Sequence, residues 1–460
     1  MFFDRDDHLK HLNEQYEKEE FYAVSLYSAP KMGKTTFLRK LCENKTYLYF
    51  RAEKTTSNEN FLKLKSEALR IFGEDKKLCQ AKRFAELFRA LARLSKENQL
   101  VLILDEYQQL VEENRRLSTL IRSYREKEWK TSGLFVVLCK PADWYEKEKE
   151  SEGSQILLRP FTFFETRLFF ERYPIREQME LYGIIGGVPG YFEVFDKTKS
   201  FQENLKQLFF TDSGAFFKTP ERFQGYVEQP RIAYSILSAL KNKHCKLHEI
   251  SEQTGFTTSV TSTALGELEE LGVIEKLIPV TEEEGSRRAR YRIRDGVLRF
   301  WYTFVSERVN QIEMGNGENA FELEVLPKLN EYFTGTFEDI CRQFLRLLLE
   351  KGEAPFAYTH VGNWWGQHPT KKRTEYVPIA AADENNILLG NCFWSDEWID
   401  LDGLAQLQKH ASLFPHSTKW YVLFAKSDFV MGMSMMYGET VRVYTLKDMC
   451  EYAKEKIGNL

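Results

Sequence analysis

The stretch from Tyr22 to Arg39, Y-A-V-S-L-Y-S-A-P-K-M-G-K-T-T-F-L-R, constrains the fold of this chain more than any other. Its first residues, Tyr22 to Tyr27, are apolar, β-branched or aromatic, as in a buried strand. A short loop ends in Gly33-Lys34-Thr35, and a helical pattern follows. A strand, a loop that closes on Gly-Lys-Thr and a helix are the context of a phosphate-binding P-loop. The stretch therefore predicts a loop that holds the phosphates of a nucleotide.

The chemistry of such a loop gives its residues separate roles. Backbone N–H groups and the helix N-terminus present partial positive charge to an anion. We expect Lys34 to act as a catalytic residue on the β- and γ-phosphates and Thr35 to give its hydroxyl to Mg²⁺. The residues expected to contact the nucleotide are Ser28, Ala29, Pro30, Lys31, Met32, Gly33, Lys34, Thr35 and Thr36. Ser28 stands where the motif G-x-x-x-x-G-K-[ST] has its first glycine, and serine lacks glycine's freedom at positive φ.

A second motif, Leu100–Glu106 (L-V-L-I-L-D-E), follows about seventy residues later. Five consecutive apolar residues are typical of a strand that is covered on both faces. The two carboxylates that end it fit a Walker B motif. Asp105 is then the residue that holds Mg²⁺, and Glu106 is the general base that polarises the attacking water. Together the two motifs predict an ATP site with Mg²⁺.

Strands alternate with helices through the first part of the chain, with further short apolar runs at 46–50, 134–138 and 156–158. This alternation predicts an α/β domain with a parallel sheet, whose ligand lies at the carboxyl ends of the strands. The turn around Gly186-Gly187-Val188-Pro189 bends the chain sharply inside a helical segment that we interpret as a lid.

From Ile232 the pattern changes to three short helices at 232–241, 247–253 and 259–271, followed by two strands at 273–280 and 288–293. This order predicts a winged helix-turn-helix. Its third helix opens with Thr and Ser but carries no Lys or Arg, and it ends in acidic residues. The wing offers a basic strip for duplex DNA, formed by Arg287, Arg288, Arg290 and Arg292 with Arg294. DNA contact and an intramolecular or protein-docking role are equally compatible with this sequence.

The chain has 460 residues, which is too long for one ordinary core. We predict a P-loop domain with a helical lid at 1–227, a winged helix at 228–310 and a further α/β domain at 311–460. A net charge of −4 gives no global attraction for nucleic acid, and seven scattered cysteines suggest neither a zinc site nor a disulfide framework. The charged start and the lack of a long apolar run predict a cytoplasmic protein without a membrane partner.

Taken together, these stretches resemble the archaeal-type P-loop ATPases, which are close to the AAA+ and STAND lineages. In that family a winged helix and a restriction-endonuclease-like domain follow the ATPase domain. The resemblance rests on Phe3-Asp4-Arg5, Asp105-Glu106-Tyr107-Gln108, Gly186–Pro189, Tyr291–Asp295 with Phe300–Phe304, Phe337–Cys341 and Gly362-Asn363-Trp364-Trp365.

The resemblance implies roles for residues outside the two motifs. Arg5 matches an F-x-x-R entry near the adenine, and Gly187 and Pro189 match a G-x-P turn that lines the nucleotide. Lys140 stands at a strand end where related ATPases sense the γ-phosphate, although an exposed lysine is the simpler interpretation.

The nuclease-like part departs from the family's catalytic pattern. Pro378 stands in place of the Asp of an I-D-I-V strand, and Asn391 and Phe393 replace the Glu and Lys of G-E-x-K-W. Hydrolysis of a phosphodiester with Mg²⁺ needs those carboxylates and that lysine. A shift of one residue could restore a single acid, Glu375 or Asp383. We therefore predict a domain without nuclease activity.

Two functions remain open from the sequence. The first is an ATPase that acts as a nucleotide-dependent switch, with slow hydrolysis supported by Glu106. The second is a regulator that binds DNA, a protein partner or a second copy of itself, in which the nucleotide is structural and turnover is negligible.

Overall fold

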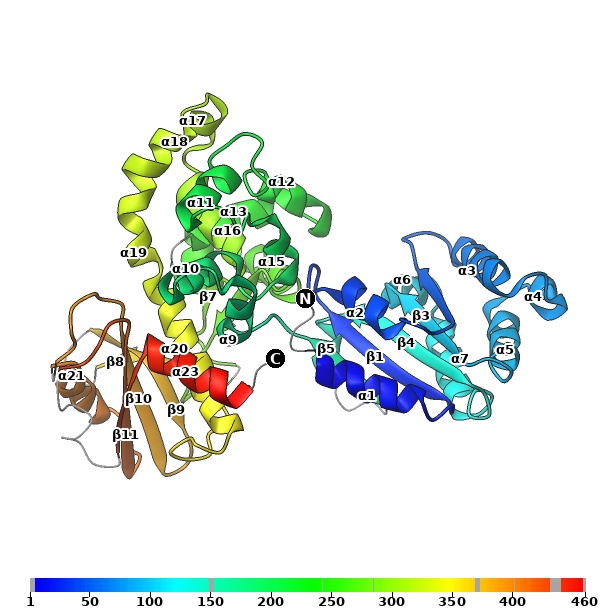
Figure 1. Cartoon of the computed structure of the whole chain (residues 1–460). Helices are drawn as coiled ribbons and strands as arrows, with labels where there is room; N and C mark the ends of the chain where they lie inside the picture. Colours follow the sequence, from blue (N-terminus) through cyan, green and yellow to red (C-terminus); the bar gives the residue numbers. More distant parts are fainter. Residues whose placement is uncertain are drawn as a thin grey trace. The chain divides into compact units, whose positions relative to one another are not determined.

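The computed structural model describes residues 5–148, 153–241, 243–283, 285–368, 373–400, 402–430 and 440–457 (Figure 1). Phe3 and Asp4, on which part of the family resemblance rests, lie outside the described residues. The chain divides into two compact units, Met1–Pro160 and Phe161–Leu460, and each is considered by itself. The boundaries predicted at 227/228 and 310/311 both fall inside the second unit and remain predictions.

The first unit is built on a five-stranded sheet in the order β2-β3-β4-β1-β5, and every neighbouring pair is parallel. Its strands are β1 (Tyr22–Ser28), β2 (Tyr47–Arg51), β3 (Leu100–Asp105), β4 (Leu134–Pro141) and β5 (Ser154–Leu158). All six residues of β3 are buried, as its unbroken apolar run predicts. The predicted α/β class with a parallel sheet is therefore confirmed.

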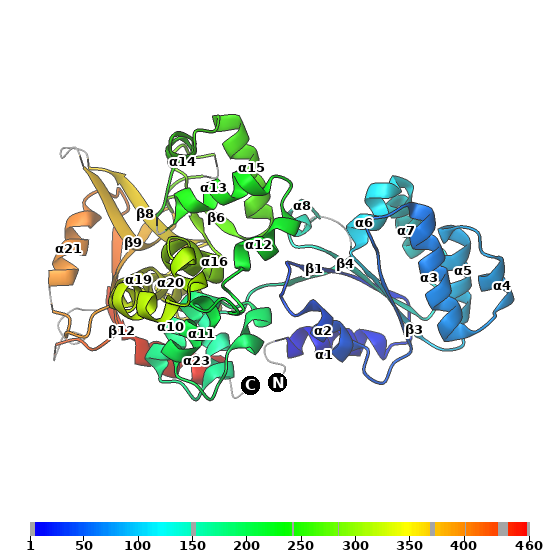
Figure 2. The same cartoon turned by 90° about the horizontal axis from the view of Figure 1, so that it is seen from above.

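Helices cover both faces of this sheet (Figure 2). Alternate residues of β4 show the two faces, since Phe135 packs on Tyr16 of α1 while Val136 belongs to the cluster that holds Phe88 of α5. The helices are α1 (Asp6–Tyr16), α2 (Lys34–Leu41), α3 (Ser57–Phe72), α4 (Lys76–Gln80), α5 (Phe84–Leu94), α6 (Tyr107–Glu113), α7 (Arg115–Glu126) and α8 (Trp144–Glu148).

The second unit begins with helices packed through an aromatic core. They are α9 (Phe163–Thr166), α10 (Ile175–Ile185) and α11 (Phe201–Phe209), and α12 (Thr219–Phe223) follows them in the chain. Three helices then lead into an antiparallel pair of strands: α13 (Pro230–Leu240), α14 (Leu247–Thr254), α15 (Thr258–Glu270), β6 (Ile274–Leu277) and β7 (Arg290–Ile293). The strands are shorter than predicted, because Pro279 has no N–H and the N–H of Val280 is donated to Asn363 O of a different sheet, at 3.0 Å.

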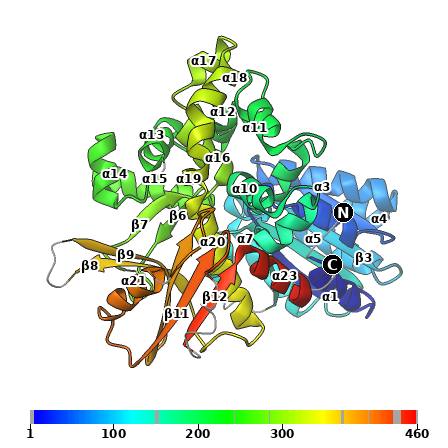
Figure 3. The same cartoon turned by 60° about the vertical axis from the view of Figure 1, so that its left-hand side comes forward.

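A run of helices connects this hairpin to the last sheet: α16 (Gly296–Phe300), α17 (Val309–Glu313), α18 (Gly317–Ala320), α19 (Leu329–Tyr332) and α20 (Thr334–Glu350). The sheet has the order β12-β11-β10-β9-β8 and is mixed (Figure 3). Its strands are β8 (Val361–Gln367), β9 (Thr374–Ala382), β10 (Asn386–Phe393), β11 (Thr418–Ala425) and β12 (Val441–Thr445). Pairs among β8, β9 and β10 are antiparallel, whereas β10, β11 and β12 are parallel.

Each face of this second sheet has its own helical cover. Phe344 of α20 and Ala453 of α23 (Leu446–Ile457) belong to the core on one face, with Val422 of β11. Leu404 of α21 (Asp402–Ala411) packs with Leu423 on the other. The predicted separate C-terminal α/β part is therefore confirmed. No helix among the described residues is both long and apolar enough to pass through a lipid bilayer.

Candidate functional site

The predicted phosphate-binding loop lies between β1 and α2, at the carboxyl end of the parallel sheet. Gly33 precedes α2 with φ of 77° and ψ of 19°, a left-handed conformation that glycine adopts without strain. The first-turn N–H groups of α2, which have no partner within the helix, therefore open onto the loop. The loop residues from Ser28 to Thr36 are contiguous around this opening, with Thr35 and Thr36 exposed.

Ser28 does not strain the loop. It is the last residue of β1, pairs with Pro141 and Leu158, and is 8% exposed. Its hydroxyl donates to Ala29 O at 2.9 Å. The positive φ among the non-glycine residues of the loop falls on Lys31, at 65°. The backbone conformation at Ser28 therefore does not require glycine, the residue that usually begins this motif.

Lys34 lies against both carboxylates of the predicted Walker B motif, the Mg²⁺ ligand Asp105 and the general base Glu106. Its Nζ is 2.5 Å from Asp105 Oδ1 and 3.2 Å from Glu106 Oε1. The side chain of Asp105 is 4% exposed, that of Lys34 21% and that of Glu106 31%. Burial disfavours the charged lysine, but the two carboxylates outweigh it and raise the pKa of Lys34 above its ordinary value. Residues that are 71 and 72 positions apart in the sequence are thus in direct contact.

Asp105 and Glu106 are held by further contacts that the sequence did not predict. Tyr49 of β2 donates its hydroxyl to Asp105 Oδ2 at 2.8 Å, and Gln108 donates to Glu106 Oε2 at 2.7 Å. Glu106 has φ of 53° and ψ of 45°, a left-handed conformation that is uncommon outside glycine and occurs often at functional sites. Gln108 belongs to the Asp105-Glu106-Tyr107-Gln108 motif noted in the sequence. Nothing in the sequence of the strand around Tyr49 indicated a contact with Asp105.

Arg5 binds the backbone of the phosphate-binding loop. Its guanidinium donates through Nη1 to the carbonyl oxygen of Met32 and through Nη2 to Arg159 O at 3.4 Å. Arg5 is only 5% exposed. The structure thus brings Arg5 to the loop, and the contact it makes there is with the protein backbone.

The donor set fits a nucleotide with Mg²⁺. The group combines a cationic lysine, a helix N-terminus, a threonine hydroxyl and a buried aspartate, which is the set that phosphate-bound Mg²⁺ uses. Among the described residues, no group of three or more His, Cys, Asp or Glu side chains could hold a metal ion alone. Thr35 and Asp105 would hold Mg²⁺ together with phosphate oxygens, and the ion would supply charge neutralisation on those phosphates.

Gly187 and Pro189, predicted to line the nucleotide, belong to the second unit. A Cβ atom at Gly187 would lie 1.7 Å from Phe161 O, and the N–H of Phe161 donates to Gly187 O at 2.8 Å. Pro189 begins a short helical turn. The absence of a side chain at Gly187 is therefore required by packing within the second unit.

Lys140 at the end of β4 is not an exposed lysine. Its side chain is 9% exposed and its Nζ lies 2.5 Å from Glu148 Oε2. Tyr27 donates its hydroxyl to the same oxygen at 2.5 Å. Burial lowers the pKa of Lys140 despite this ion pair. The simpler interpretation offered for this residue was wrong.

The predicted basic strip is not a continuous surface. Arg287 and Arg288 are exposed, and Arg288 pairs with Glu282 at 2.8 Å. Arg290 is half-buried and its guanidinium lies 5.3 Å from the ring centre of Trp365. The side chain of Arg292 is 12% exposed and lies between Glu275 and Asp339, at 2.5 and 2.7 Å. Its inclusion among surface cations for DNA was wrong, because Glu275 of the paired strand β6 and Asp339 of α20 enclose its guanidinium group.

The segment between β6 and β7 lies along β8 of the last sheet. Trp364 donates its indole N–H to Thr281 Oγ1 at 3.1 Å, and Trp365 donates to Arg288 O at 3.1 Å. The two tryptophans are 7% and 3% exposed. The Trp-Trp pair noted in the sequence thus serves to dock this hairpin segment onto the C-terminal sheet.

The positions that replace the nuclease motif have structural contacts. Pro378 O accepts a hydrogen bond from Arg342 at 2.6 Å, and Asn391 Oδ1 accepts from the backbone N–H of Cys392 at 3.0 Å. The two acids that a shifted alignment would bring in are also engaged. Glu375 pairs with Arg373 and His410, and Asp383 accepts backbone N–H groups of its own turn.

Comparisons with known proteins match two separate stretches of the chain. Residues 2–195 match a family described as an ATPase domain predominantly from Archaea. Residues 301–408 match a family of archaeal and bacterial proteins of unknown function. An uncharacterised protein of Methanocaldococcus jannaschii is 26% identical over 398 residues, which cover 84% of this chain and 85% of that protein.

Similar solved structures include a Walker-type ATPase of Pyrococcus abyssi, with a TM-score of 0.49, 20% identity and coverage of 65% of this chain and 96% of that one. A STAND protein of Pyrococcus horikoshii with a tetratricopeptide repeat sensor has a TM-score of 0.32 and 14% identity, with 76% and 50% covered. The P-loop geometry and the two family matches agree: residues 2–195 are similar to the archaeal-type ATPase domains, and residues 301–408 match the second family.

Proposed function

We propose that the N-terminal unit binds MgATP, hydrolyses it slowly and acts as a nucleotide-dependent switch. The observation that carries this proposal is the contact of Lys34 with both Asp105 and Glu106 at the mouth of the loop. A nucleotide phosphate can replace the two carboxylates as the partner of the Lys34 ammonium group, because the phosphate is also an anion and the helix N-terminus favours its binding.

In this proposal the residues of the loop and β3 have distinct tasks. Lys34 moves from the carboxylates to the β- and γ-phosphates, which frees Asp105 for the shell of Mg²⁺ beside Thr35. Glu106, no longer paired with Lys34, accepts a proton from the attacking water. Gly187 and Pro189 line the nucleotide in the bound state, as the family resemblance implies.

Two variants and one control test the proposal in the full chain. Glu106→Gln should retain ATP binding and reduce steady-state hydrolysis at least about 100-fold, since it removes the general base. Lys34→Ala should weaken ATP binding in calorimetry. Lys40→Ala, on the same helix but 46% exposed and paired with Glu43, should change neither.

The outcomes separate the functions that the sequence left open. ATP binding with negligible wild-type turnover would favour a structural nucleotide in a regulator. No ATP binding by the wild-type chain, or binding that Lys34→Ala leaves unchanged, would exclude both roles for the nucleotide.

A second candidate function concerns the three helices and the hairpin at 228–310, interpreted as a winged helix. The hydrogen bonds of Trp364 to Thr281 and of Trp365 to Arg288 favour an intramolecular or protein-docking role. DNA binding would depend on the exposed Arg287 and Arg288. It predicts duplex affinity that falls steeply with salt and drops in the double variant Arg287→Ala/Arg288→Ala, whereas no binding at low salt would exclude it.

We also propose that the C-terminal part has a nuclease-like fold without phosphodiester chemistry. The replacement of the acidic and basic motif residues by Pro378, Asn391 and Phe393 supports this. The full chain should leave supercoiled plasmid intact with Mg²⁺ or Mn²⁺. Cleavage that EDTA abolishes would contradict the proposal.

A further inference from the structure

The hydroxyl of Tyr49 contacts a different oxygen of Asp105 from the one that Lys34 and the Glu106 N–H contact. Lys34 Nζ and the backbone N–H of Glu106 both reach Oδ1, at 2.5 and 2.9 Å. Tyr49 reaches Oδ2 at 2.8 Å. The tyrosine hydroxyl is the donor in this contact, because a carboxylate oxygen accepts hydrogen bonds.

The position of Tyr49 follows from the pairing of β2 with β3. In this parallel pair Tyr49 lies opposite Ile103 and Arg51 opposite Asp105. The side chain of Tyr49 thus extends from the edge strand β2 towards the carboxyl end of β3, where Asp105 is two residues beyond Ile103. Since Asp105 is 4% exposed on its side chain, water has little access to replace this hydrogen bond.

We propose that Tyr49 is a positioning residue for Asp105, holding Oδ2 so that Oδ1 faces the Mg²⁺ shell once Lys34 has moved to the phosphates. This inference rests on the proposed function, because it concerns the metal that accompanies ATP. A carboxylate with one oxygen fixed by a donor has less freedom to lose on binding an ion, and groups that orient ligands in this way commonly change metal affinity 10- to 100-fold.

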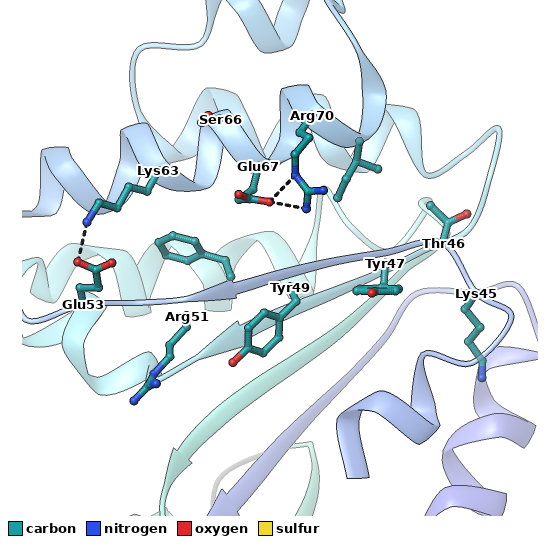
Figure 4. Close-up of a pocket in the computed structure, with 12 residues that line it drawn as sticks. Lys45, Thr46, Tyr47, Tyr49, Arg51, Glu53, Lys63, Ser66, Glu67 and Arg70 are labelled. Atoms are coloured by element: carbon teal, nitrogen blue, oxygen red, sulfur yellow. Dashed lines mark hydrogen bonds and ion pairs between the residues drawn. The ribbon is translucent and has the colours of Figure 1, made fainter. Parts of the chain in front are cut away.

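The same strand provides a matched control. Tyr47 and Tyr49 are on one face of β2 and both line a groove of about 780 Å³ beside α3 (Figure 4). Tyr47 is 48% exposed and Tyr49 36%. Among the described residues, the Tyr47 hydroxyl has no hydrogen-bond partner. Replacing either tyrosine by phenylalanine keeps the ring in the groove and removes only the hydroxyl.

The test measures nucleotide affinity with and without the metal, independently of turnover. Binding of a fluorescent, non-hydrolysable ATP analogue to the full chain is titrated in excess Mg²⁺ and in EDTA. We expect Tyr49→Phe to bind like wild type in EDTA, within twofold, and to lose about tenfold of the affinity gained from Mg²⁺. Tyr47→Phe should match wild type in both buffers.

Each outcome decides between the two proposals. If wild type binds the analogue and Tyr49→Phe shows the full gain from Mg²⁺, the positioning role is wrong while the ATP site stands. If Tyr49→Phe loses the same amount of nucleotide affinity in both buffers, Tyr49 has a structural role and the positioning role is also wrong. If wild type binds nothing in either buffer, the proposed function itself fails, and the inference fails with it.

Discussion

Arg292 of the hairpin donates from Nη2 to Asp339 Oδ1 of α20 at 2.7 Å, and Asp339 is shared with Arg342 at 2.5 Å. Glu275 lies on the other side of Arg292 at 2.5 Å. The positive charges of Arg292 and Arg342 are balanced, because the carboxylates of Glu275, Glu338 and Asp339 pair with them. The two guanidinium groups hold the pKa of Asp339 well below its ordinary value, against the effect of burial. An arginine that looks like part of a DNA-binding surface is thus an internal link between the hairpin and α20.

Removing the shared acid should destabilise the second unit. Asp339→Asn leaves two largely buried guanidinium groups without their common partner, and we expect a loss of about 3 kcal/mol in the free energy of unfolding. Urea denaturation measures it. The control is Arg70→Met, which breaks a surface pair with Glu67 at 73% exposure and should cost about 0–1 kcal/mol. Equal effects of the two variants would contradict an internal role for Arg292 and Asp339.

A side chain at Gly187 should not be tolerated. Gly187→Ala places Cβ 1.7 Å from Phe161 O, so the backbone must shift and about 3 kcal/mol or more of stability should be lost. Gly266→Ala, at an exposed position of α15 where a Cβ would meet nothing within 4 Å, should instead gain about 0.5–1 kcal/mol. Thermal unfolding of both variants checks the opposite signs. A Gly187→Ala protein as stable as wild type would show that the turn relaxes freely.

Two glycine substitutions in the phosphate-binding loop should have opposite effects. Lys31→Gly relieves a left-handed backbone at φ of 65° and should raise the free energy of unfolding by about 0.5–1 kcal/mol. Ser28→Gly increases the conformational entropy of the unfolded chain at a strand position. It should therefore lower the free energy of unfolding by a similar amount, although it restores the glycine of the usual motif. Denaturant titration compares the two. A stabilising Ser28→Gly would mean that this position does need glycine.

Stability should decrease on mild acidification through His244. Burial, assisted by the nearby Arg292 charge, lowers the pKa of His244 to about 4 from its ordinary value of 6.5. The folded state therefore keeps a neutral imidazole that the unfolded chain protonates. Its contribution is complete above pH 6.5 and is lost as the pH falls from 6.5 towards 4.

Between pH 7 and pH 5 this amounts to about 1–2 kcal/mol. His244→Gln should lose less stability than wild type over the same interval, when both are followed by urea denaturation. Identical pH profiles would exclude His244 as the source of any loss.

Local motifs and the tertiary structure contributed differently to the site. Gly33-Lys34-Thr35 and Asp105-Glu106 were predicted because each depends on a single strand and the turn that follows it, and a parallel sheet brings such turns to one edge. Tyr49 could not be predicted in the same way. Its contact with Asp105 depends on the register of β2 against β3 and on the direction of one side chain.

The sequence by itself determined the strands and helices of the α/β unit, the loop residues proposed to bind phosphate and the replacement of the nuclease motif. These follow from apolar periodicity and from residue chemistry within a few positions of the chain. Only the tertiary structure decided that Ser28 is unstrained, that Lys140 is buried and that Arg292 is internal. Whether a charged side chain faces water or a carboxylate depends on what packs against it, and Asp339 and Glu275 reach Arg292 from elements 47 and 17 residues away.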